Sequence, residues 1–87
     1  MKEYLSASDA IELIQVETAR GFRCLGADGI EIVPGGVMGR LDLIIDASGD
    51  RMMLEAAAET TIDFIRANSA ENIVWDVVIG EEAETSG

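Results

Sequence analysis

The sequence predicts a single α+β domain, with two helices on one face of a small mixed or antiparallel sheet. The chain has 87 residues, of which 48% are hydrophobic, which suffices for one thin core and leaves no room for a second domain. Short β-prone segments are grouped before one strongly amphipathic helical segment, and a further strand follows it. The expected order is α-β-β-β-α-β, with three or four strands in a domain spanning residues 1–80.

Residues 6–19 are expected to form the first helix, with Ser6 or Ser8 as its N-cap. The apolar residues of this segment spread around most of the helical wheel, so residues 11–18 could instead form a strand. A short strand at residues 2–5 would change the order to β-α-β-β-α-β, which is the split βαβ pattern.

The middle of the chain is typical of strands. Residues 22–25 and 30–33 are expected to pair as a hairpin around a turn at residues 26–29, because Asp-Gly between β-prone runs is a strong turn signal. The glycine-rich residues 34–39 are expected to be a flexible link. This link does not fit a phosphate-binding loop, because it leads into a strand and contains no lysine. Apolar side chains occupy every second position of residues 41–47, as they do in a strand with one face fully covered.

Residues 51–67 form the clearest predicted helix, with Asp50 as the expected N-cap and alanine as the most abundant residue type. Residues 73–79 are expected to be an interior strand, because they are nearly apolar on both faces. Residues 81–87 are expected to be a flexible acidic tail. The side chains expected in the core are those of Leu43, Ile45, Leu54, Ala58, Ile62, Ile65, Trp75 and Val77.

Charge excludes several classes of partner. The chain has 17 acidic residues, 6 basic residues and no histidine, for a net charge of −11. Such a chain is not expected to bind nucleic acid through phosphates, or to adhere to an anionic membrane. No apolar run approaches the roughly 20 residues of a membrane span. Cys24 is the single cysteine and there is no apolar leader, so we expect a cytoplasmic protein without an internal disulfide.

We expect no enzyme activity, no metal site and no cofactor. Without histidine, no Ser/His/Asp or Cys/His arrangement can form. Cys24 is expected to be a small core residue, since no histidine is present to activate its thiol. The segment from Asp46 to Asp50 has two carboxylates but lacks the further acidic positions of a calcium loop, so a strand end followed by a helix cap is the preferred interpretation.

The strongest functional signal is a row of carboxylates on the predicted helix 51–67. Glu55, Glu59 and Asp63 follow one another at intervals of four residues, opposite the apolar face. Successive carboxylates in this row are about 6 Å apart along the helix axis, close to the spacing of phosphates along one nucleic-acid strand. The row therefore indicates a partner protein with a basic surface, and Asp42 and Asp46 are further candidates for the same patch.

In size and charge the chain resembles small inhibitors encoded by phages, such as anti-CRISPR proteins, and immunity proteins against toxic nucleases, although no residues match. This likeness identifies no family and transfers no site. The carboxylate row and the net charge of −11 are what indicate a non-catalytic inhibitor that mimics nucleic acid and occludes a basic, nucleic-acid-binding surface. Two alternatives stay open. The acidity could instead reflect solubility or a high-salt habitat. The domain could also be a structural subunit that forms a homodimer through the second face of its sheet, where Ile44, Val74 and Val78 would be exposed.

Overall fold

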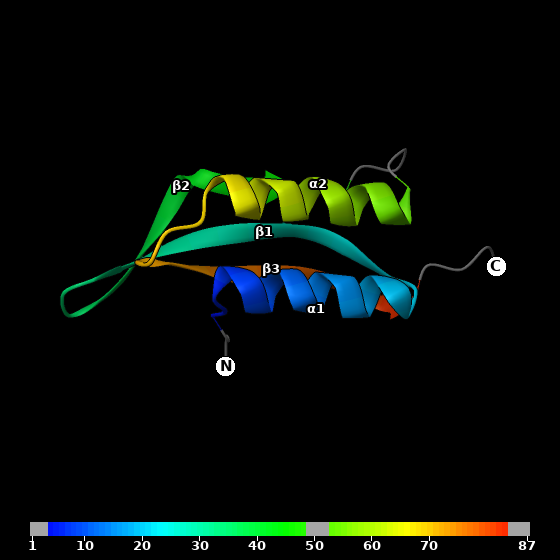
Figure 1. Cartoon of the computed structure of the whole chain (residues 1–87), viewed down its shortest axis with the longest axis horizontal. Coiled ribbons are helices and arrows are strands. Elements are labelled where there is room, and N and C mark those ends of the chain that lie inside the picture. The colour runs from blue at the N-terminus through cyan, green and yellow to red at the C-terminus, as the bar shows by residue number, and fades with distance from the viewer. Residues whose placement is uncertain (1–3, 49–52, 84–87) are drawn as a thin grey trace.

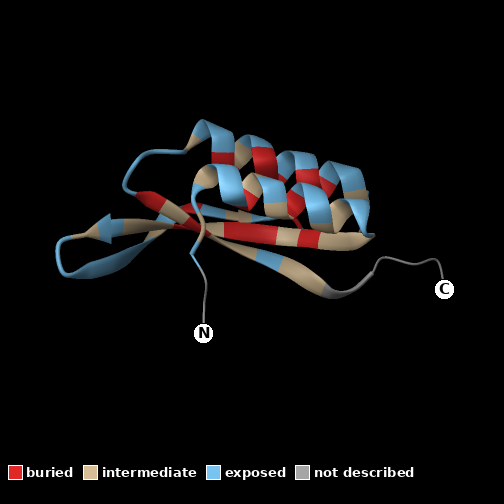
Figure 2. Ribbon diagram, turned by 60° about the horizontal axis from the view of Figure 1, so that its bottom comes forward, coloured by how far each residue is buried: buried red, intermediate tan, exposed pale blue. Residues whose placement is uncertain are grey.

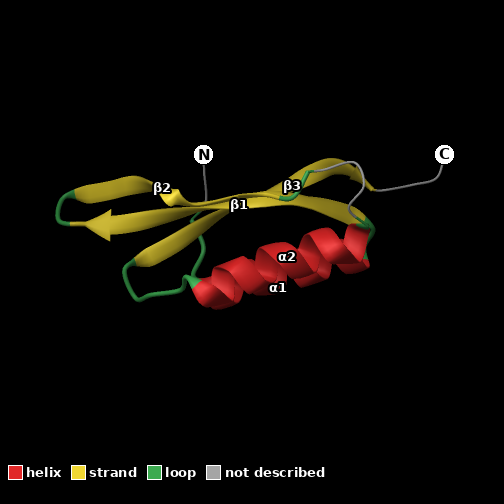
Figure 3. Cartoon of the chain, turned by 90° about the horizontal axis from the view of Figure 1, so that it is seen from above, coloured by secondary structure: helices red, strands yellow, loops and turns green. Residues whose placement is uncertain are grey.

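The computed structural model describes residues 4–48 and 53–83. Its elements follow the order α-β-β-α-β and are, by residue range, helix α1 (Ala7–Ala19), strands β1 (Phe22–Val33) and β2 (Gly36–Asp46), helix α2 (Leu54–Ala67) and strand β3 (Ile73–Ala83). The strands pair antiparallel in the order β2-β1-β3. Both helices lie on one face of this sheet (Figures 1 and 3). The predicted α+β class is confirmed, with one strand fewer between the helices than expected.

The predicted hairpin within residues 22–33 is wrong, because this segment is the single long strand β1. The chain reverses later, at Pro34 and Gly35, where Gly35 has a φ of 86°. Gly26 does leave the usual strand conformation, with a φ of 146°, but the register against β3 shifts at this point and Leu25 is the extra residue. A bulge therefore absorbs the unusual glycine without ending the strand.

Most of the predicted flexible link is also strand, since β2 begins at Gly36. The register of β2 against β1 then jumps from Gly39 to Ile44. The residues in between bulge out of the ladder, and Leu41 at this bulge is 90% exposed. The tip of the β1–β2 hairpin, which lies beyond this bulge, projects past the ends of the helices (Figure 1).

The first helix begins as predicted. Ser6 is its N-cap, and the backbone N–H of Asp9 donates to Ser6 Oγ at 3.2 Å. Residues 11–18 are helical, so the strand alternative is wrong. Before the helix, Leu5 forms a single antiparallel bridge with Trp75 through two backbone hydrogen bonds. This bridge is all that the described chain shows of the expected strand at residues 2–5, whose residues 2 and 3 lie outside the described residues.

The second helix and the last strand differ from the prediction at their ends. Helix α2 begins at Leu54, and its N-cap Met53 offers no side-chain hydrogen bond. The predicted cap Asp50 and residues 51–52 lie outside the described part of the chain. Strand β3 continues to Ala83, which pairs with Phe22, so residues 81–83 of the predicted tail belong to the strand. Residues 84–87 lie outside the described residues.

The core fills the layer between the helices and the sheet (Figure 2). Ile14, Ile65 and Trp75 are fully buried there, and the rings of Phe64 and Trp75 meet edge to face with centroids 6.0 Å apart. Of the predicted core, five residues are buried, namely Leu43, Ala58, Ile62, Ile65 and Trp75, whereas the partly buried ones are Ile45, Leu54 and Val77. Neither described helix is long and apolar enough to cross a membrane.

Candidate functional site

The acidic row lies on the solvent side of α2. Glu55, Glu59 and Asp63 are all exposed, while Ala58 and Ile62 on the same helix are buried against the sheet. The amphipathic period of this helix explains the separation, because residues four apart stay on one face. The structure therefore brings the three predicted carboxylates together on one exposed side of α2.

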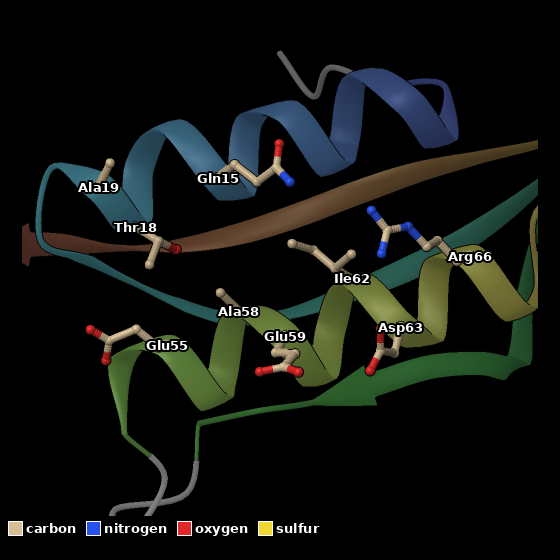
Figure 4. Close-up of a pocket in the computed structure, with 9 residues that line it drawn as sticks. All are labelled: Gln15, Thr18, Ala19, Glu55, Ala58, Glu59, Ile62, Asp63 and Arg66. Atoms are coloured by element: carbon tan, nitrogen blue, oxygen red, sulfur yellow. The ribbon is translucent and has the colours of Figure 1, made fainter.

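This row borders an open groove between α1 and α2 (Figure 4). The groove has a volume of about 500 Å³, and its lining comprises Gln15, Thr18 and Ala19 of α1 and Glu55, Ala58, Glu59, Ile62, Asp63 and Arg66 of α2. Ile62 and Arg66 reach from α2 toward α1. The groove thus combines an apolar floor with three carboxylates and one cation, that of Arg66. The excess of carboxylates suits the aliphatic stem and cationic head of a lysine or arginine.

The helix layer as a whole is acidic. Helix α1 carries Asp9, Glu12 and Glu17 and has no basic residue in its last turn. Arg20, which caps this helix, is 3.1 Å from the Glu17 carboxylate and stacks over the ring of Phe22. Within the two helices the basic side chain is that of Arg66. The groove therefore lies in a negative field, which attracts cationic groups over distances of about a Debye length.

Asp42 does not join the acidic row. It lies at the β2 bulge, where Nε and Nη2 of Arg40 donate to its two carboxylate oxygens at 2.9 and 2.8 Å. Arg40 also donates from Nη1 to Glu31 Oε1 at 2.8 Å and so links the bulge to β1. The hydrogen bonds from Arg40 lower the pKa of Asp42, and the two acids raise the pKa of Arg40. Asp42 is thus paired with Arg40 within the bulge, whereas among the described residues no ion pair forms with the three carboxylates of the row.

Asp46 also lies apart from the row, at the end of β2. Its carboxylate accepts hydrogen bonds from the Ser48 hydroxyl and from the Ser48 backbone N–H, and these bonds lower its pKa. These hydrogen bonds stabilise the turn that follows β2, and the strand ends at Asp46, close to the predicted end at residue 47. Asp50, the other acid of the candidate cation loop, lies outside the described residues.

No family model, curated protein or solved structure matches the chain. Its surfaces and reactive groups are therefore the guide to its function. Among the described residues, no three side chains of the metal-ligating kinds are grouped as a metal site would need. Cys24 is fully buried in the core with its thiol free.

Sequence reasoning missed a second surface feature, which is a hollow lined by residues of all three strands and by Ser48. It lies on the sheet face opposite the two helices, which cover only the other face (Figure 3). The exposed or half-buried apolar side chains that line it include those of Leu25, Ile44 and Val78, and Gly26 also lines it. The apolar character of this face was predictable from the alternation of residues on the last strand. The hollow itself was not, because it depends on the pairing of Gly26 between β2 and β3.

Proposed function

We propose that this domain is a non-catalytic protein-binding module, and that the α2 face binds a basic protein surface of the kind that otherwise holds nucleic acid. The observation that supports the proposal most is the exposed row of Glu55, Glu59 and Asp63 along one side of the α1–α2 groove. Bound in this way, the domain would exclude nucleic acid from its partner by occupying the same surface. The proposed setting is the cytoplasm, as for a phage-encoded inhibitor of a host nuclease complex.

The chemistry of the groove favours arginine or lysine side chains as the groups that enter it. An arginine stem would pack against Ala58 and Ile62, and its guanidinium would meet the carboxylate of Glu59. Successive carboxylates are about 6 Å apart along α2, so basic residues spaced to contact phosphates of one strand would contact them as well. The net charge of −11 would speed the encounter with such a partner at low salt.

The row of three carboxylates also destabilises helix α2. Carboxylates four residues apart on a helix repel one another, by a few tenths of a kcal/mol per pair. If the acidic residues served only solubility or life in a saline habitat, they would be spread over the surface, and no row of this kind would be needed. The placement of three acids beside a groove therefore favours recognition over solubility.

Competition with nucleic acid tests the proposal. A labelled DNA is bound to nucleic-acid-binding proteins that have basic grooves, beginning with an RNA-guided nuclease of the Cas9 type, and its displacement by the domain is followed by fluorescence anisotropy. The double variant Glu55→Lys/Glu59→Lys is expected to lose displacement while keeping its circular dichroism spectrum.

A matched control changes the net charge equally at exposed acids outside the groove, in the variant Glu12→Lys/Glu71→Lys. This control should displace DNA within about threefold of the parent, with the difference disappearing as salt screens the exposed charges. Equal loss in both double variants would mean that the overall field, and not the row, drives binding. Absence of competition across the whole set of proteins would contradict the proposal.

A further inference from the structure

The open face of the sheet has a hollow that is lined by a glycine of the central strand. Gly26 on the central strand β1 is paired between Asp46 on β2 and Val78 on β3. Its φ is 146°, and a Cβ built here would collide with the carbonyl oxygen of Ile45. A side chain is therefore excluded at this position by the backbone of β2, and Gly26 lines a depression of about 390 Å³ together with Leu25, Ile44 and Val78.

Apolar side chains continue from this hollow along the open face. Ile44 is 49% exposed and Val78 is 43% exposed at the hollow itself. Further along β1, Ile30 is paired between Gly39 and Val74, and Ile32 is paired with Val37. Directly paired residues share one face of a sheet, so these side chains extend the apolar strip toward the hairpin tip. An exposed apolar strip on a sheet face that neither helix covers indicates an interaction surface.

Carboxylates interrupt the strip at the hollow. Asp28 is paired with Ile44 on one side and with Asp76 on the other, and both Asp28 and Asp46 line the hollow. An apolar depression with acids at its border is complementary to an apolar side chain that is flanked by basic ones.

We propose that this face binds an amphipathic basic helix of a partner protein, with an apolar side chain in the Leu25–Ile44–Val78 hollow and lysine or arginine beside Asp28 and Asp46. A helix fits the exposed face of a sheet, as α1 and α2 already do on the other side. An extended segment would need a free sheet edge instead. The β2 edge is interrupted by its bulge, and the β3 edge is already bridged by Leu5 at Trp75.

Charge also distinguishes this partner from a second copy of the chain. Two copies packed through the open face would each bring Asp28 and Asp46 into a shared, desolvated interface, within chains of net charge −11. Like charges placed together in an interface suppress association. The surface lies on the opposite side of the sheet from the α2 row, so the inference does not rest on the proposed function.

An NMR titration of the full chain with a synthetic amphipathic Leu/Lys helical peptide tests the inference. We expect the largest amide shifts at Leu25, Ile44 and Val78, and no binding of the corresponding Leu/Glu peptide. Ile44→Ser should weaken binding about tenfold, since it removes one apolar wall of the hollow. Asp28→Asn should weaken binding and reduce its dependence on salt.

Val16→Ser is the matched control, because Val16 on α1 is 49% exposed, as Ile44 is. It should leave the affinity within about twofold of the parent.

Val78→Ser provides a second change in the hollow in case Ile44→Ser disturbs the fold. Shifts confined to the α1–α2 groove, at Gln15 and Ile62, would overturn the inference and would leave the proposed function standing. Sedimentation that shows a dimer of the protein alone, broken by Ile44→Ser, would assign the face to a second copy and would also overturn it.

Discussion

Leu43 lies directly over Gly29, and its side chain fills the space that a side chain on Gly29 would need. A Cβ at Gly29 would be 2.6 Å from the Cβ of Leu43 and 2.9 Å from its Cδ1. Leu43 is 6% exposed and belongs to the core cluster. The glycine therefore allows the bulged strand β2 to place a leucine in the core next to the central strand.

Gly29→Ala is expected to destabilise the domain by about 1–3 kcal/mol, because the added methyl group displaces a packed core side chain. Urea denaturation followed by tryptophan fluorescence measures the change. Gly39→Ala is the control, since a Cβ at Gly39 meets nothing within 4 Å. Equal stability of the two alanine variants would show that Leu43 moves aside without cost.

The same pair explains where sequence reasoning failed in the fold. Asp28-Gly29 between β-prone runs has the local chemistry of a hairpin turn, and nothing nearby in the sequence contradicts it. The strand continues because Leu43, from the next strand, packs on the glycine, which is a tertiary contact that local patterns do not contain. The first helix was ambiguous for a related reason. Helix α1 contacts α2, β1 and β3, so its apolar residues face several directions.

The acidic row was predictable because it depends on helical periodicity alone. The groove beside it was not, because its other side comes from Gln15 and Thr18 on α1. Asp42 was expected as a further member of the patch, and the structure pairs it with Arg40. A local signal for this pair was present. Arg40 is two residues before Asp42, and residues two apart share one face of a strand, so an ion pair between them could have been expected.

Ile65→Ala tests the core assignment. Ile65 is fully buried, and its truncation should cost roughly 2–5 kcal/mol. Since small domains have a net stability of about 5–15 kcal/mol, this change should lower the denaturation midpoint strongly. Trp75 is the single tryptophan and is fully buried, so its emission reports unfolding.

Leu41→Ala is the control for this measurement, because Leu41 is 90% exposed at the β2 bulge. We expect it to stay within about 0.5 kcal/mol of the parent. A loss for Leu41→Ala as large as that for Ile65→Ala would contradict the placement of the core.

The ion pair at the bulge predicts a pH dependence of stability below pH 4. Arg40 lowers the pKa of Asp42 below its usual value of 3.8, so the folded state binds fewer protons than the unfolded state in this range. The stabilisation is fully present above the unfolded pKa and is lost as the pH falls through the folded pKa. Carboxyl NMR titration should show Asp42 ionised below pH 3.8, and Arg40→Ala should return its pKa toward that value.

Asp46 is an internal control in the same titration. Its pKa is lowered by hydrogen bonds from Ser48, so it should not respond to Arg40→Ala. A parallel rise of both pKa values would point to a general change in the field and would contradict the local ion pair.

Glu59→Gln tests whether the acidic row is maintained at the expense of stability. Glu59 is four residues from both Glu55 and Asp63, so the change removes two like-charge pairs from α2. We expect the domain to gain about 0.5 kcal/mol at low ionic strength and to lose this gain at about 1 M salt, where exposed charges are screened. Glu71→Gln alters the net charge equally at an exposed site outside the helix and should change stability less. Equal gains in the two variants would mean that the repulsion is spread over the whole surface. If Glu59→Gln is more stable than the parent and also displaces less DNA, the row exchanges stability for binding, which is the recurrent trade-off at functional surfaces.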